Sequence, residues 1–175
     1  MSLRITYRVR QFWQALAFHA ESVDARMWEE HLNPAQRWLF QGMAIAEQRH
    51  SLAVLHTLQA DGHSEQALLQ AALLHDMGKA GAQVQLGHRV VTVLMRSLAL
   101  ALLTRLARNE PGSWRYPFFV QLHHAERGAD LAAGAGTHAL AVALIRWHHT
   151  APNKSELDPQ GQELLAWLQA ADEQN

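Results

Sequence analysis

The chain has 175 residues, 49% of them hydrophobic and 18% charged, with only 10 glycines and 5 prolines. This composition excludes collagen-like, low-complexity and disordered proteins, and it predicts a single domain with its own core. The 15 basic and 16 acidic residues nearly balance, so no global positive field favours a nucleic-acid partner. The absence of cysteine excludes disulfides, iron–sulfur clusters and thiolate zinc sites, whereas the 12 histidines could bind metal together with carboxylates.

No segment of the sequence has the length and apolarity of a membrane span or of a secretory signal. The most apolar stretch, residues 90–106, is interrupted by Arg96 and Arg105. It therefore falls short of the roughly 20 apolar residues that cross a bilayer. We expect no membrane span, and a cytoplasmic location is the default expectation.

Nearly every segment repeats its apolar residues at the helical spacing of three and four. In chain order, we expect one apolar helix face over 39–58, a turn at 61–64 with Ser64 as a helix cap, and a helix from about 65 that stops near 78–81. Further helices are expected over 90–107, from 116 or just after 122 to a break at 134–136, and over 140–147. The last helix is expected to open at Pro159 or Gly161 and to cover 163 to about 171. β-branched residues are few, and neither a linker nor an internal repeat divides the chain. The sequence thus predicts an all-α fold, a compact bundle of six to eight helices in one domain, residues 1–175.

Six tryptophans are scattered along the chain rather than clustered. We therefore expect them to anchor the core rather than to form a platform on which bases stack. They are Trp13, Trp28, Trp38, Trp114, Trp147 and Trp167.

Histidines and acids follow apolar helical segments at five points along the chain. They are His50, the pair His75-Asp76, His124, the pair His148-His149, and Asp172. Because each polar group directly follows an apolar face, each would be partly buried and would need a partner. Five or six nitrogens and oxygens are too many for one tetrahedral ion, but they suit two ions that share a carboxylate. Asp76 is the natural bridge, because a carboxylate has two oxygens.

Residues 73–79, which read Leu-Leu-His-Asp-Met-Gly-Lys, resemble the signature of the HD-domain superfamily of metal-dependent phosphohydrolases. Residues 124–129 are similar to the second-metal motif of the branch with paired metals, in which a histidine is followed four residues later by glycine. Residues 145–148 and 170–172 resemble the motifs that carry the next ligand and the last one. The resemblance covers the chain from about residue 46 to 175 as an HD core and leaves residues 1–40 as an N-terminal helical extension.

The resemblance implies a ligand set and a set of catalytic residues. One divalent metal would be held by His50, His75, Asp76 and Asp172, and a second by Asp76, His124 and His148. The ions would be iron, manganese or a similar transition metal. Beside the bridging Asp76, Lys79 would contact a substrate phosphate, and His149 or Arg127 would assist the leaving group. The position of His148 directly after Arg146-Trp147 favours it over His149 as the ligand.

The six-ligand branch implies hydrolysis of a phosphate ester or anhydride by a hydroxide that two metals activate. The expected substrate is a phosphorylated small molecule, a nucleotide or a dinucleoside polyphosphate such as diadenosine tetraphosphate. A cyclic di-guanylate phosphodiesterase is disfavoured, because no Gly-Tyr-Pro motif follows His149. Two alternatives stay open: a di-iron oxygenase with the same six ligands, and a non-catalytic regulatory HD domain. A homodimer is compatible with the sequence.

Overall fold

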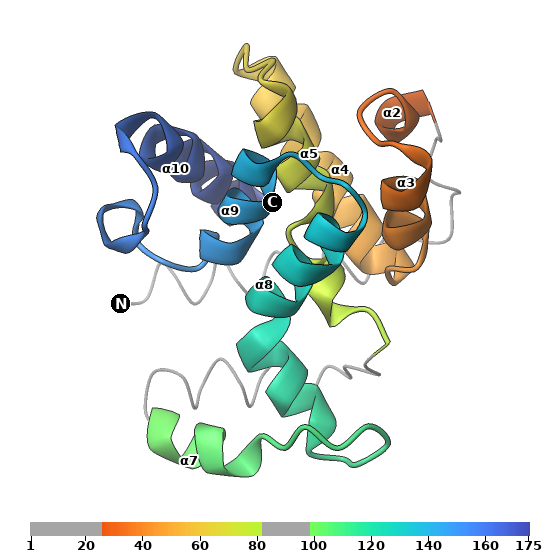
Figure 1. Ribbon diagram of the computed structural model, residues 1–175, viewed down its shortest axis with the longest axis vertical. Helices are drawn as coiled ribbons and strands as arrows, with labels where there is room; N and C mark the ends of the chain where they lie inside the picture. The colour runs from red at the N-terminus through yellow and green to blue at the C-terminus, as the bar shows by residue number, and fades with distance from the viewer. Residues whose placement is uncertain (1–25, 82–98) are drawn as a thin grey trace.

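The computed structural model describes residues 26–81 and 99–175, and every regular element in these two ranges is helical (Figure 1). In chain order the α-helices are α2 (Arg26–Glu29), α3 (Pro34–Gln41), α4 (Ile45–Ala60), α5 (Gln66–Leu74), α7 (Leu100–Leu106), α8 (Tyr116–Gly134), α9 (Ala139–Trp147) and α10 (Pro159–Gln174). Two 3₁₀-helices, η1 (Met77–Lys79) and η2 (Pro152–Lys154), join them. The predicted all-α fold is confirmed. The helix expected over 90–107 is described only from residue 99 onward.

The expectation of one continuous apolar helix over 39–58 is wrong, because the chain turns between α3 and α4. Gly42 closes the last turn of α3, and α4 begins three residues later. Met43 lies in the turn and is still buried. The apolar spacing therefore continues through this turn although the helix does not.

Side-chain caps set where several helices begin. Asn33 and Gln36 form a reciprocal capping box at the start of α3, in which each side chain accepts a hydrogen bond from the other residue's backbone N–H. The Asp158 carboxylate accepts a hydrogen bond from the Gly161 N–H, which starts α10 at Pro159, one of the two openings predicted for it. Ser64 does not cap α5, whose N-cap is the next residue along the chain.

Helix α5 is the centre of the bundle. Its side chains are apolar on nearly all sides, and a helix of that kind must be surrounded by other elements. Leu68, Leu73 and Leu74 are completely buried, with α4, α9 and α10 packed around them. Trp28 and Phe40, from α2 and α3, belong to the same core cluster. The residues that directly follow α5 are therefore placed inside the bundle.

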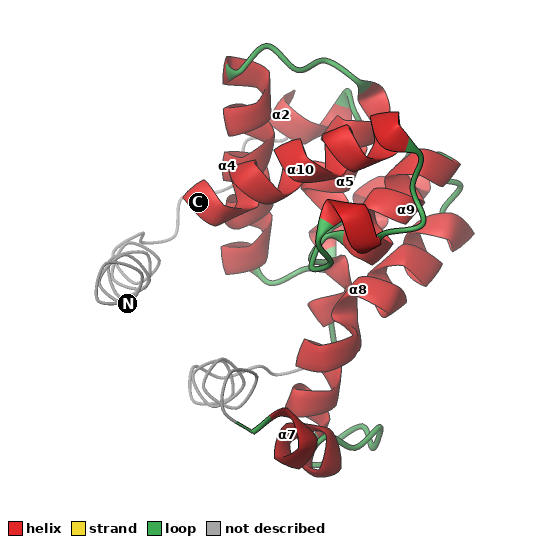
Figure 2. Ribbon diagram, turned by 90° about the vertical axis from the view of Figure 1, so that its left-hand side faces the viewer, coloured by secondary structure: helices red, strands yellow, loops and turns green. Residues whose placement is uncertain are grey.

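The N-terminal half of α8 leaves the bundle and carries α7 at its far end (Figure 2). Its C-terminal half packs against α9 through small residues, with Gly128, Ala129 and Ala132 all buried. Small side chains let the two helix backbones approach closely. The middle of α8 also packs against η1, the 3₁₀-helix that follows α5.

The prediction that the tryptophans anchor the core is wrong for Trp38 and Trp114, which are 75% and 66% exposed. Trp38 precedes the buried Phe40 by two residues, and this spacing puts them on nearly opposite faces of α3. Trp28 is buried, as predicted. Trp13 lies outside the described residues.

Candidate metal centre

Segments far apart in the sequence bring all the predicted ligands to one place in the bundle. The end of α5, the middle of α8 and the end of α9 meet near the centre of Figure 1. The side chains come from α4 (His50), the end of α5 (His75, Asp76), α8 (His124), the residues after α9 (His148, His149) and the last turn of α10 (Asp172). Helix α10 continues past Asp172 to Gln174, so this carboxylate stands on regular helix.

The two oxygens of Asp76 face different histidines. Oδ2 lies 3.7 Å from Nε2 of His75. Oδ1 lies 3.5 Å from Nε2 of His124 and 4.0 Å from Nε2 of His148. The Asp76 side chain is almost completely buried, so its charge is stabilised by the protein rather than by bulk water. A carboxylate in this position lies between two groups of nitrogen donors.

Asp172 completes the group around His75. Its Oδ1 lies 2.8 Å from Nε2 of His50 and 3.7 Å from Nε2 of His75. The side chains of His50 and Asp172 are each about a quarter exposed. This side of the centre is therefore open to solvent, as is the exposed His149 in the other ligand group.

Three of the histidines are oriented in the same way by their own helices. Nδ1 of His75, His124 and His148 lies 2.9, 3.0 and 2.6 Å from the carbonyl oxygen three residues earlier, that of Ala72, Gln121 and Ile145 respectively. A carbonyl only accepts, so each Nδ1 carries the proton and each Nε2 presents a lone pair. Nε2 of His75 and of His148 are buried and have no hydrogen-bond partner within the described ranges.

His148 and His149 both reach the centre, from one short turn after α9. His149 Nε2 lies 2.9 Å from His124 Nε2, and the ring centroids of His148 and His149 are 4.0 Å apart. Together with His124 they form a group whose ligand atoms all lie within 4.8 Å of one another. His50, His75 and Asp76 form a second such group. The centre thus contains two neighbouring sets of potential ligands.

The protonation states suit metal binding. Burial, followed by the positive charge of Lys79, lowers the pKa of His124 to about 3. Burial and the neighbouring His149 also hold the pKa of His148 well below its usual value. Burial raises the pKa of Asp76, but Lys79 and the surrounding histidines outweigh it and hold this pKa well below the usual range. At neutral pH the centre therefore offers neutral imidazoles and an ionised carboxylate.

The pKa of His50 shifts in the opposite direction to those of His124 and His148. Burial alone would lower its pKa, but the hydrogen bond to Asp172 and the charges of Asp76 and Asp172 outweigh it and raise the pKa. Burial raises the pKa of Asp172, but the same hydrogen bond and the charges of His75 and His50 together outweigh it and lower the pKa of that carboxyl. In the absence of metal, the hydrogen bond between His50 and Asp172 therefore favours the protonated form of His50 and the ionised form of Asp172.

This donor set fits a divalent transition metal. Imidazole nitrogens combined with carboxylate oxygens suit zinc, iron, manganese and related ions. The buried Nε2 atoms of His75 and His148, which lack partners, are the groups that such an ion would satisfy. In metal sites, a ligand histidine typically donates the N–H of its other ring nitrogen to a carbonyl or carboxylate, as the three Nδ1 atoms do here.

Lys79 also lies in this centre, together with Glu47, a residue that no sequence motif singled out. Its Nζ lies 2.5 Å from Oδ2 of Asp76 and 3.8 Å from Oε2 of Glu47. Glu47 stands in the first turn of α4, three residues before His50, and it is buried. The signal in the sequence was an acid at helical spacing from a predicted ligand, a pattern that surface helices also show.

Arg127 contacts the 3₁₀-helix that follows Asp76. Its Nη1 donates a 2.7 Å hydrogen bond to the carbonyl oxygen of Gly78, and its guanidinium lies over the ring of Tyr116. These contacts connect α8 to η1, and they give no support to the leaving-group role predicted for this arginine.

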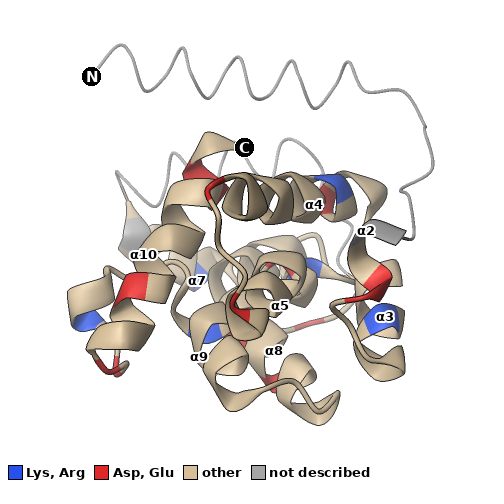
Figure 3. Ribbon diagram, turned by 90° about the horizontal axis from the view of Figure 1, so that it is seen from above, with Lys and Arg blue, Asp and Glu red and all other residues tan. Residues whose placement is uncertain are grey.

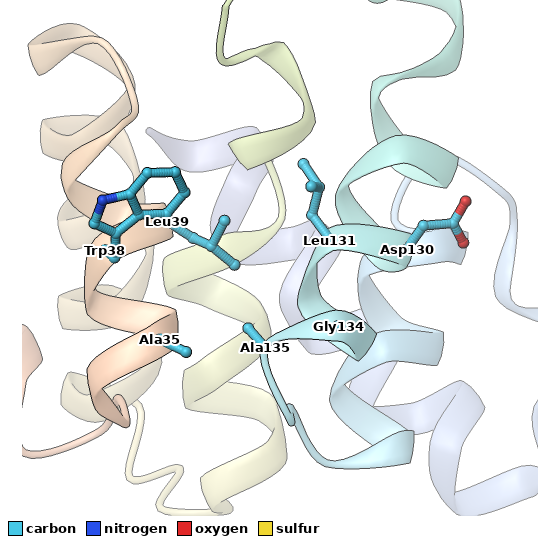
Figure 4. Close-up of a pocket in the computed structure, with 7 residues that line it drawn as sticks. All are labelled: Ala35, Trp38, Leu39, Asp130, Leu131, Gly134 and Ala135. Atoms are coloured by element: carbon cyan, nitrogen blue, oxygen red, sulfur yellow. The ribbon is translucent and has the colours of Figure 1, made fainter.

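Two surface features lie apart from the centre. In the view of Figure 3, basic and acidic residues of the described helices are interspersed rather than gathered by sign. A shallow groove of about 490 Å³ runs between α3 and α8, where Trp38 and Leu39 face Leu131 and Gly134 (Figure 4). It contains none of the predicted ligands.

No protein-family model, no curated protein and no solved structure matches this chain. Among the described residues, no helix is both long enough and apolar enough to cross a membrane. The functional interpretation therefore rests on the centre itself, a buried cluster of histidines and carboxylates that could bind metal.

Proposed function

We propose that this chain is a metal-dependent phosphohydrolase of the HD-domain type, with two divalent cations and a nucleotide or dinucleoside polyphosphate as substrate. The observation that carries the proposal is the position of Asp76, whose two oxygens face two separate groups of histidines. A shared carboxylate between two nitrogen-rich groups is the arrangement that a two-metal hydrolase needs. Iron and manganese are the ions that we favour.

The ligands divide between the two cations. His50, His75, Oδ2 of Asp76 and Asp172 would hold one ion. His124, His148 and Oδ1 of Asp76 would hold the other. We add His149 to this second group in place of its predicted leaving-group role, because its Nε2 is 2.9 Å from that of His124. Two nitrogens about 2.1 Å from one ion lie about 3 Å apart, so the spacing suits a common ion.

The residues around the ligands would then support the chemistry of the bound metals. When bound, a pair of divalent cations lowers the pKa of a water molecule and polarises a phosphoryl oxygen. Lys79 would bind a phosphate oxygen and stabilise charge that develops during the reaction, because its ammonium is already inside the centre. The Nδ1–carbonyl bonds of His75, His124 and His148 would keep the rings in place.

The test begins with metal content. Protein purified without chelator and without a histidine tag should contain about two equivalents of iron or manganese by elemental analysis. It should release phosphate or a nucleotide from diadenosine tetraphosphate or from a simple aryl phosphate, in the absence of oxygen as well as in air. Asp76→Ala should lose both the metal and the activity, while Asp61→Ala, at an exposed position, should keep both. Metal-loaded protein that cleaves none of these, or an active Asp76→Ala protein, would contradict the proposal.

A further inference from the structure

The ammonium of Lys79 lies between two buried carboxylates. It is 2.5 Å from Oδ2 of Asp76 and 3.8 Å from Oε2 of Glu47, and the Lys79 side chain is itself 18% exposed. An acid in the first turn of a helix is usually exposed and interacts with the helix dipole. Glu47 is instead only 6% exposed, and a buried carboxylate is costly unless a cation accompanies it.

The contact between Lys79 and Asp76 conflicts with metal binding. Oδ2 of Asp76 is the oxygen on the side of His75, so a metal held by His75 and Asp76 would use the atom that Lys79 occupies. An ammonium and a divalent cation on one buried oxygen repel each other strongly, because little solvent screens them. The lysine must therefore leave Asp76 when the metal arrives, and it needs another anionic partner inside the centre.

We propose that Glu47 is a positioning residue that takes the Lys79 ammonium from Asp76 when a divalent metal binds. Glu47 is already within 3.8 Å of Nζ and lies on the helix that carries His50. With Glu47 present, the charge of Lys79 stays inside the centre without blocking Asp76. This inference rests on the metal centre of the proposed function and adds a residue to it.

The experiment measures metal affinity rather than activity. The 175-residue chain is treated with EDTA, dialysed and titrated with Mn²⁺ at a single pH by calorimetry. Glu47→Gln should bind Mn²⁺ more weakly than wild type, by about tenfold, because Lys79 then stays on Asp76. Lys79→Met should bind at least as tightly as wild type, because the competitor is gone. Exposed positions provide matched controls, Glu163→Gln and Lys154→Met, and these should bind as wild type does.

The double variant decides between charge and packing. Glu47→Gln combined with Lys79→Met should recover the affinity of Lys79→Met, which a purely structural role of Glu47 would not allow. Glu47→Asp, which keeps the charge, should bind Mn²⁺ nearly as wild type does. Weak binding by the double variant, or equal weakening by Glu47→Asp and Glu47→Gln, would overturn the inference.

The two proposals fail in different ways. If the wild-type protein bound no Mn²⁺, both the proposed metal centre and the proposed role of Glu47 would be contradicted. If wild type and Glu47→Gln both bound two equivalents of Mn²⁺ with the same affinity, only the proposed role of Glu47 would be contradicted.

Discussion

The backbone of Gly78 lies directly against the backbone of His124. A Cβ atom added to Gly78 would stand 1.9 Å from the carbonyl oxygen of His124 and 2.7 Å from the backbone nitrogen of Gly128. The 3₁₀-helix that follows Asp76 is therefore held against α8 at the residue that carries the predicted second-metal ligand. This contact sets how far apart the two ligand groups lie.

Replacing Gly78 with alanine should destabilise the protein by about 3 kcal/mol, because the new methyl group meets backbone atoms that cannot move aside cheaply. Urea denaturation monitored by circular dichroism measures this loss. Gly134→Ala is the matched control, since nothing lies within 4 Å of the added Cβ at that helical position. It should change the free energy of unfolding by no more than about 0.5 kcal/mol. Equal stability of the two variants would contradict the close contact.

Arg127 also stabilises the contact between η1 and α8, through its hydrogen bond to the carbonyl oxygen of Gly78. Arg127→Met should cost about 2 kcal/mol, because it removes a charged donor from the partly buried carbonyl of Gly78. Arg146→Met removes a more exposed arginine that pairs with Asp130, and it should cost well under 1 kcal/mol. Thermal denaturation of the two variants side by side makes the comparison. A larger loss for Arg146→Met would show that Arg127 does not support η1.

Much of the centre was predictable because its ligands follow apolar helical segments. The apolar run that makes α5 central also delivers His75 and Asp76 to the interior, and helical spacing alone indicates this. The target of Arg127 was not predictable, because a backbone carbonyl 49 residues away has no signature in the sequence. Met43 kept the apolar spacing intact across a turn, so periodicity could not reveal the break between α3 and α4.

Replacing His124 should lower the metal content of the protein, whereas replacing its neighbour His123 should not. The side chain of His124 is buried against Asp76, whereas that of His123 is 43% exposed and lies against Phe119. His124→Ala should lower the metal content from about two equivalents to about one, because only the second ligand group loses a member. His123→Ala should retain both equivalents by elemental analysis. Equal losses in the two variants would mean that His124 is not a ligand.

The buried histidines should also make the stability of the EDTA-treated protein depend on pH. The pKa of His124 is about 3 in the folded chain against a usual 6.5, so between these values only the unfolded chain binds the proton. Stability therefore falls as the pH drops below 6.5, and at pH 5 this one group would account for about 2 kcal/mol. His148, whose pKa is also lowered, acts in the same direction, whereas His50, whose pKa is raised, opposes it. The lowered pKa values of Asp76 and Asp172 matter only below about pH 4.

Urea denaturation at pH 7 and at pH 5 tests this dependence. Wild-type protein without metal should lose stability between the two conditions, and His124→Gln should lose about 2 kcal/mol less, because glutamine does not titrate. The exposed His56 offers the control, and His56→Gln should follow wild type. If His124→Gln lost as much stability as wild type between pH 7 and pH 5, the folded chain would bind the proton on His124 as readily as the unfolded chain does, and the lowered pKa of this histidine would be contradicted.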